Sequence, residues 1–133
     1  MPDVVNVVLV HSTGQLPDVW TGVVRALPAG WKPWLPNLSV QSLEQYLDKQ
    51  ELRRVVLVGH GTGALAAARL AREQPQRITH AVLSLPETPR LVPRFLRRRQ
   101  EEALDTPVPT LRTATGPGQP EQLVAEISSL LAD

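Results

Sequence analysis

The sequence predicts an α/β protein: one domain, residues 1–133, with an open, mostly parallel sheet of five to six strands and helices on both faces. Apolar, β-branched segments alternate along the chain with segments whose apolar residues recur at helical spacing. This alternation is typical of parallel sheets with right-handed crossovers. The two most apolar segments, 4–10 and 55–58, are each followed by a glycine-containing loop. They are the best candidates for central strands.

Length and composition limit the class of protein. The chain has 133 residues, 42% of them hydrophobic and 20% charged, which is ordinary for a single globular domain. Fourteen basic and thirteen acidic side chains give a net charge of +1, too balanced to favour nucleic-acid binding. Without cysteine there is no disulfide, thiolate nucleophile or Cys-based zinc site. No segment has the roughly 20 apolar residues of a membrane span, and no signal-peptide pattern is present, so we expect a cytoplasmic protein.

The first half of the chain reads as strand, helix, strand, helix. The first helix begins near Pro17, because proline suits the first helical turn. Residues 31–35 form a short strand, in which Pro33 indicates an edge position or an early end. Ser39 or Ser42 could cap the next helix.

The second half continues the alternation and ends in a helix. The expected elements are a strand at 55–58, a helix at 64–70 that ends before Pro75, strands at 78–85 and 109–115, and a helix from Pro120 to Leu131. Segment 86–109 is the least regular, and it contains an amphipathic helix around residues 91–99.

The strand order follows from the apolar pattern. If 4–10 and 55–58 are neighbours at the centre, the order is 2-1-3-4-5, with a topological switch point between them. Ligands of open α/β sheets bind in the crevice at that point. The loops 11–15 and 59–63 would line it.

The loop at 59–63 allows two interpretations. A strand, three alternate glycines and a helix present backbone N–H groups at a helix start, where an anion or a carbonyl oxygen is favoured. Gly59, Gly61 and Ala64 satisfy the dinucleotide fingerprint G-x-G-x-x-[G/A]. That fingerprint needs an acidic residue after the next strand, and Glu87 is a poor match. It also normally follows the first strand of its unit, whereas this strand is the third.

The second interpretation is a resemblance to a known family. The run VVLVGHGTGA at 55–64 resembles the nucleophile elbow G-x-S-x-G of the α/β-hydrolases. VVLVHSTG at 7–14 looks like that family's first central strand with its oxyanion loop. Further matching segments occur in the family's order, at Trp20, 30–38, 75–86 and 119–124. The resemblance implies a minimal α/β-hydrolase-like fold without a large lid, in which 86–109 replaces the lid.

The departures from the family pattern affect catalysis. Gly61 occupies the nucleophile position, and glycine has no side chain. The stretch at 113–118, where the family carries its catalytic histidine, contains none. The family's acid follows a late strand, and Glu87 and Asp105 are the candidates in that part of the chain. Since removing triad members costs several powers of ten in rate, we do not expect ordinary serine hydrolysis.

The candidate site residues come from the two loops and the end of the fourth strand. His60, His11 and Glu87 are candidates for acid–base catalysis, although histidines at the first two positions are usually structural in the resembled family. His80 is expected at the surface, away from the crevice. The candidates for ligand binding are Ser12, Thr13, Gly61 and Thr62.

Three functions remain open. The first is a cofactor-free, non-hydrolytic enzyme of the cyclase, lyase or isomerase type, with His60 or His11 transferring a proton. The second is a pseudoenzyme that binds a small-molecule ligand or a protein partner. The third is a dinucleotide-binding module. We further expect no metal site, a homodimer or accessory-subunit interface through 86–109, and, from the excess of Arg over Lys, a bacterial source.

Overall fold

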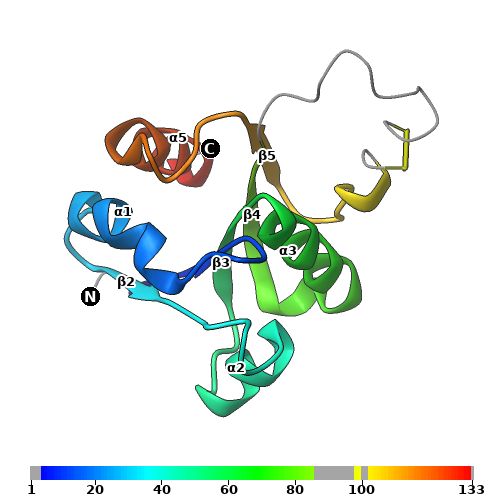
Figure 1. Ribbon diagram of the computed structural model, residues 1–133. Helices are drawn as coiled ribbons and strands as arrows, with labels where there is room; N and C mark the ends of the chain where they lie inside the picture. The colour runs from blue at the N-terminus through cyan, green and yellow to red at the C-terminus, as the bar shows by residue number, and fades with distance from the viewer. Residues whose placement is uncertain (1–3, 86–97, 100–101, 133) are drawn as a thin grey trace.

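The structure, a computed structural model, describes residues 4–85, 98–99 and 102–132. Its centre is a five-stranded sheet in the order β2-β1-β3-β4-β5 (Figure 1). The strands are β1 Val5–Val10, β2 Trp31–Trp34, β3 Val55–His60, β4 Ile78–Ser84 and β5 Thr110–Thr113. Every neighbouring pair is parallel, so the predicted fold class and strand order are confirmed.

Helices cover both faces of the sheet. The helical elements are η1 Pro17–Trp20, α1 Thr21–Ala26, α2 Leu43–Lys49, α3 Thr62–Glu73, η2 Pro75–Arg77 and α5 Pro120–Ala132. The pair α1 and α5 lies on one face, while α2 and α3 lie on the other (Figure 1). No helix among the described residues is both long and apolar enough to cross a membrane.

The central strands are apolar on both sides because each side packs under a different helix pair. Val8 and Leu57 belong to the core beneath α2 and α3, while Leu9 and Val58 belong to the core beneath α1 and α5. All four are completely buried. This alternation explains the continuous β-branched runs in the sequence. On α3 the core contacts are mostly alanines, which let the helix lie close to the sheet.

Several element boundaries differ from the sequence prediction or sharpen it. β3 extends through Gly59 to His60, two residues beyond the predicted end. Of the two candidate caps for α2, Ser42 is the one used: its side chain accepts from the Gln45 N–H in a capping box. β2 is an edge strand, as Pro33 indicated. Most of the predicted helix around 91–99 lies outside the described residues.

His80 corrects one expectation. It was predicted at the surface, but on β4 it is only partly exposed, and its Nδ1 is buried without a hydrogen-bond partner among the described residues. In the sheet, His80 is the register partner of Val56 on the central strand β3.

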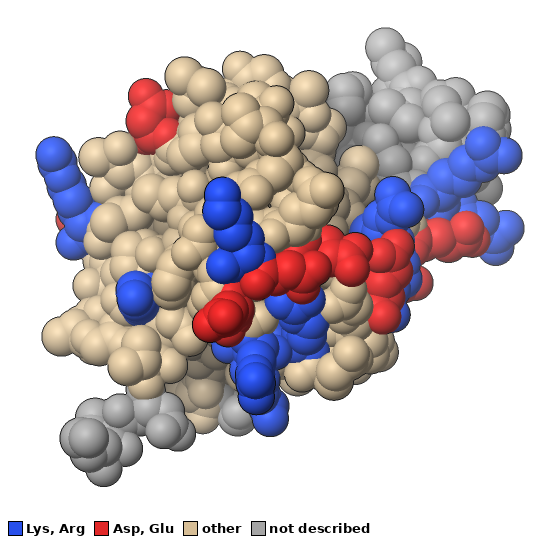
Figure 2. Space-filling model, turned by 90° about the horizontal axis from the view of Figure 1, so that it is seen from below, with Lys and Arg blue, Asp and Glu red and all other residues tan. Residues whose placement is uncertain are grey.

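Charged side chains are mixed on the surface. On the face in Figure 2, acidic side chains form a row with basic side chains on both sides of it. The ion pairs among the described residues include exposed ones such as Arg69–Glu73 at 2.8 Å. Pairs of this kind contribute little to stability because water screens them.

The end of α2 contains a strained residue. Glu51 has φ 56°, the left-handed region, and no other described non-glycine residue has a positive φ. The Leu52 N–H donates to the Leu47 carbonyl, and the Glu51 N–H donates to the Asp48 carbonyl, which is a helix ending that normally uses glycine. The left-handed conformation costs a non-glycine residue roughly 1–2 kcal/mol.

Glu51→Gly should therefore stabilise the protein. Relative to Glu51→Ala, which removes the same carboxylate but keeps the strain, we expect a free energy of unfolding higher by about 1 kcal/mol. Urea denaturation of the two variants measures the difference. Equal stability of the glycine and alanine variants would contradict the strained helix ending.

Candidate functional site

The candidate site lies at the carboxyl ends of β1 and β3, which are neighbours with Val10 opposite Gly59. Directly after β3 the chain turns sharply at Gly61, with φ 60° and ψ −126°, and α3 begins at the next residue. The Gly61 N–H donates to the Ser84 carbonyl at 2.9 Å, which ties the turn to the end of β4. The sharp turn that the resemblance of 55–64 to a nucleophile elbow implies is present.

Two glycines allow the turn to pack against the sheet. A Cβ on Gly59 would lie 2.5 Å from the Gly63 carbonyl oxygen. A Cβ on Gly63 would lie 2.5 Å from the carbonyl oxygens of both Val10 and His11. Such distances exclude any side chain at either position. Both glycines are thus required by close packing of the backbone.

A cluster of three hydroxyl groups joins the loop after β1 to the turn. The Ser12 Oγ accepts from the Thr62 N–H at 3.2 Å and lies 3.1 Å from the Thr62 Oγ1. The Thr13 N–H donates to the Thr62 Oγ1 at 2.6 Å, and that hydroxyl donates to the Thr13 Oγ1 at 2.9 Å. The two backbone N–H groups that could stabilise an anionic oxygen are therefore already bonded to side-chain hydroxyls.

The Ser12 hydroxyl also fills the space beside Gly61. A Cβ on Gly61 would lie 2.6 Å from the Ser12 Oγ. This oxygen thus stands close to where the family pattern places the nucleophile side chain. Its hydrogen-bond partners lie within Thr62, and none of its bonds among the described residues is to an imidazole.

His11 lies beneath the cluster and bridges two loops. It is 3% exposed. Its Nδ1–H donates to the Ser12 carbonyl at 2.8 Å, and its Nε2 accepts from the Leu38 N–H at 3.0 Å. Because both ring nitrogens are bonded to backbone groups, His11 holds the loop after β1 against the segment that follows β2.

His60 faces the other neighbour of β3. The Ser84 hydroxyl donates to the Thr115 carbonyl at 2.6 Å, so the His60 Nδ1–H donates to the Ser84 Oγ at 3.1 Å. These bonds leave the His60 Nε2 as a hydrogen-bond acceptor, and it has no partner among the described residues. Burial lowers the pKa of His60, because desolvation penalises the charged ring.

The crevice itself is small. Its volume is about 240 Å³, and it is lined by His11, Thr13, Gly14, Leu38, Ser39, Thr62, Gly63 and Ala66. His60 is not part of this lining. Its ring lies instead beside the loop after β5, where a Cβ on Gly116 would be 3.2 Å from the His60 Cε1.

The structure thus brings some of the predicted residues together and separates others. Ser12, Thr13, Gly61 and Thr62 form one cluster above His11, and His60 lies on the β4 side of the turn. Glu87 lies outside the described residues. Within the described part of the chain, no group of three or more His, Asp or Glu side chains could hold a metal ion.

Sequence reasoning missed the two partners of His60. Ser84 and Thr115 are buried, and they connect the ends of β4 and β5 to the imidazole. Ser84 was detectable in principle, because it is a polar residue at the carboxyl end of a strand, directly after three apolar residues. Thr115 acts through its carbonyl oxygen, which no residue type signals.

No protein-family model and no curated protein matches the sequence. Similar solved structures do exist. A "predicted CIB-like hydrolase" from Thermoplasma acidophilum shares 11% identity at a TM-score of 0.63, over 96% of this chain and 86% of that chain. An extracellular α/β-hydrolase from a Paenibacillus species shares 17% identity at a TM-score of 0.54. A haloalkane dehalogenase variant from Bradyrhizobium elkanii shares 16% identity at 0.56.

The chain has the α/β-hydrolase fold. At these identities the likeness concerns the fold and leaves the activity open. The Paenibacillus match spans 74% of this chain and 50% of that protein. The dehalogenase match spans 66% of this chain and 34% of that protein. It is therefore a minimal version of the α/β-hydrolase fold, as expected from the sequence.

Substitution of Gly61 tests the turn. We expect Gly61→Ala to lower the free energy of unfolding by about 1–3 kcal/mol, because a side chain at this φ is strained and its Cβ contacts the Ser12 hydroxyl. Adding Ser12→Gly should recover the part due to the contact. Gly118→Ala is the control, since Gly118 has open space around it and should change little. Equal effects of the two single alanine variants would contradict the turn geometry.

The free energy of unfolding should depend on pH because of His60 and His80. Burial lowers the pKa of both His60 and His80 below the usual 6.5, so the unfolded chain binds protons more readily than the folded protein does. Their contribution to stability is complete above pH 6.5 and is lost as the pH falls through the lowered pKa values.

We therefore expect the free energy of unfolding to fall between pH 7 and pH 5. His60→Gln and His80→Gln should each make the decline shallower. Urea denaturation at a series of pH values measures it, and NMR titration of the ring protons gives the two pKa values. A pKa at or above 6.5 for either ring would contradict the burial argument.

Proposed function

We propose that this protein is a non-hydrolytic pseudoenzyme of the α/β-hydrolase fold, which binds a small polar ligand at the crevice between the β1 loop and the turn after β3. The observation that carries this proposal is the Ser12 hydroxyl. It stands 2.6 Å from where a Gly61 side chain would begin and accepts from the Thr62 N–H. A hydrogen-bonded side chain thus occupies the space that a hydrolase needs for its nucleophile.

The neighbouring groups favour binding over catalysis. Activation of a hydroxyl nucleophile requires a base within hydrogen-bond distance. The titratable group of the crevice is His11, and both of its ring nitrogens are committed to backbone partners. Transfer of a proton by this ring would break a bond that holds the loop in place.

The ligand is defined by the donors and the volume of the crevice. The N–H groups of Thr13 and Thr62, with their hydroxyls, suit a carboxylate or an amide oxygen once the Ser12 hydroxyl leaves the Thr62 N–H and the Thr62 hydroxyl leaves the Thr13 N–H. A crevice of about 240 Å³ is smaller than the 300–1,000 Å³ usual for drug-sized ligands. We therefore favour a ligand of a few heavy atoms.

The test combines binding and turnover. Titration of ¹⁵N-labelled protein with acetate and with acetamide should shift the amide signals of Thr13 and Thr62. Ser12→Gly should tighten binding about three- to tenfold, because it frees the Thr62 N–H from its internal partner. The control Ser129→Gly changes an exposed serine of α5 outside the crevice lining and should bind as the wild type does.

Hydrolysis of 4-nitrophenyl acetate should not exceed the rate without protein, and a fluorophosphonate probe should not label the chain. Saturable ester hydrolysis, or titration without any shift at Thr13 and Thr62, would contradict the proposal.

The hydrogen bonds of His60 favour a second candidate function, that of a cofactor-free cyclase, lyase or isomerase. The chain of bonds from Thr115 through Ser84 leaves Nε2 of His60 available as a general base, which typically contributes about 10²–10⁴ in rate. Exchange of α-protons of a small ketone in deuterated buffer would reveal such a base without knowledge of the substrate. His60→Gln should then abolish exchange and leave the melting temperature nearly unchanged.

The remaining alternatives have less support. A dinucleotide fingerprint would bring its second glycine close to a pyrophosphate, whereas the space beside Gly61 is taken by the Ser12 hydroxyl, and Gly59 is accounted for by backbone packing. The homodimer or accessory-subunit interface through 86–109 stays a prediction, because most of that segment lies outside the described residues. A cytoplasmic location and a bacterial source also remain predictions.

A further inference from the structure

Two hollows lie at the amino ends of the strands, at the edge of the sheet opposite the crevice, and the proposed function does not use them. One has a volume of about 640 Å³ and the other about 740 Å³, and residues 51–54 between α2 and β3 line both. Each is more than twice as large as the crevice of about 240 Å³. Volumes of this size are usual for small-molecule sites.

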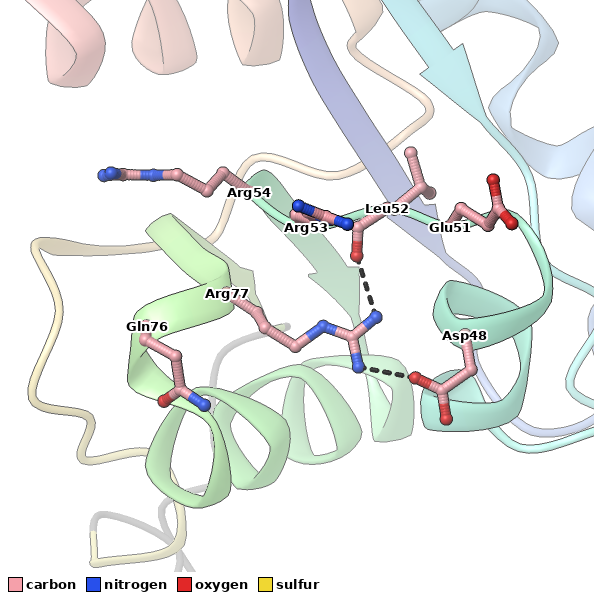
Figure 3. Close-up of a pocket in the computed structure, with 7 residues that line it drawn as sticks. All are labelled: Asp48, Glu51, Leu52, Arg53, Arg54, Gln76 and Arg77. Carbon is pink, nitrogen blue, oxygen red and sulfur yellow. Dashed lines mark hydrogen bonds and ion pairs between the residues drawn. The ribbon is translucent and has the colours of Figure 1, made fainter.

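The smaller hollow surrounds an arginine that fixes the loop. The guanidinium of Arg77 donates to the Leu52 carbonyl at 2.8 Å and to the Asp48 carboxylate at 2.7 Å (Figure 3). It also donates to the Gln74 side chain at 2.9 Å. Arg77 is thus fully engaged, and it holds the loop against the ends of α2 and α3.

Two further arginines, Arg53 and Arg54, lie in the loop itself, and their side chains are not bonded to any described residue. Arg53 and Arg54 are exposed, and neither makes a hydrogen bond or an ion pair with any residue that the structure describes. In Figure 3 the Arg54 side chain extends away from the Arg77–Asp48 pair. Both arginines line the larger hollow. Their guanidinium groups are therefore available to an anion.

The larger hollow combines this charge with apolar walls. Its apolar lining is Val4, Val5, Leu52, Val55, Val56 and Leu131. Thr79 and His80 add polar groups, and the His80 Nδ1 is a buried nitrogen without a partner among the described residues. Apolar walls with a few convergent polar groups are the usual composition of a ligand site.

The loop also carries the strain noted above. Glu51, with φ 56°, is the acidic residue of the larger hollow's lining, against the two cationic residues Arg53 and Arg54. The balance of charge in the lining favours an anion, and Glu51 limits how much negative charge it accepts.

We propose that the larger hollow at the amino-terminal edge of the sheet is a second binding site, for a small amphipathic carboxylate. The carboxylate lies between Arg53 and Arg54, and the hydrocarbon part packs on the valines. The site is separate from the crevice, so the failure of one proposal leaves the other standing.

The test uses 4-phenylbutanoate as the probe. Titration of ¹⁵N-labelled protein should shift the amides of residues 52–56 and of Thr79 and His80, and leave those of Thr13 and Thr62 in place. Arg53→Gln with Arg54→Gln should weaken binding about tenfold, because charge-assisted hydrogen bonds are lost. Arg25→Gln, another exposed arginine outside this lining, is the matched control and should bind as the wild type does.

Two further ligands separate the contributions. The neutral 4-phenylbutanol should bind at least about tenfold more weakly than 4-phenylbutanoate, and inorganic phosphate should bind weakly because it lacks the hydrocarbon. Equal affinity for the alcohol and the carboxylate would overturn the proposal. So would unchanged affinity in the double variant, or shifts confined to Thr13 and Thr62, which would assign the carboxylate to the crevice.

Discussion

The close approach of the turn after β3 to the end of β1 is the constraint on which the rest of the site depends. Gly63 lies so near the carbonyl oxygens of Val10 and His11 that a Cβ would be 2.5 Å from each. Gly59 is equally near the backbone of α3. This contact lets α3 start directly above the centre of the sheet. It therefore brings the backbone N–H groups of the helix start to the loop after β1.

That closeness also determines the chemistry. Because the two loops are in contact, hydroxyl groups fifty residues apart can satisfy the N–H groups that a hydrolase keeps free for its substrate. The absence of a side chain at Gly61 makes room for the Ser12 hydroxyl. The backbone donors are thus present at the start of α3 and in the loop after β1, while the hydroxyl groups around them form a closed set of hydrogen bonds. A ligand oxygen must compete with these internal bonds.

The two edges of the sheet differ in what they offer a ligand. At the carboxyl edge the polar groups are bonded to one another around a small crevice. At the amino-terminal edge, Arg53 and Arg54 have no partner among the described residues, and they border a larger hollow. Parallel sheets usually bind ligands at the carboxyl edge, since the helix starts gather there. In the part of this chain that the structure describes, the unpartnered guanidinium groups of Arg53 and Arg54 lie at the other edge.

The sequence by itself determined the fold, because burial on both faces requires apolar runs and such runs are visible without coordinates. The strand order followed from the two most apolar segments, and the positions of the candidate loops followed from the order. The end of β3 was misjudged because glycine at 59 suggests a turn, whereas here it continues the strand and permits close packing. Only the tertiary structure decided that His60 faces β4 while Ser12 and Thr62 face β1. The side to which a residue turns depends on register and on the exact path of the turn, and hydrogen bonds between distant segments leave no pattern in the chain.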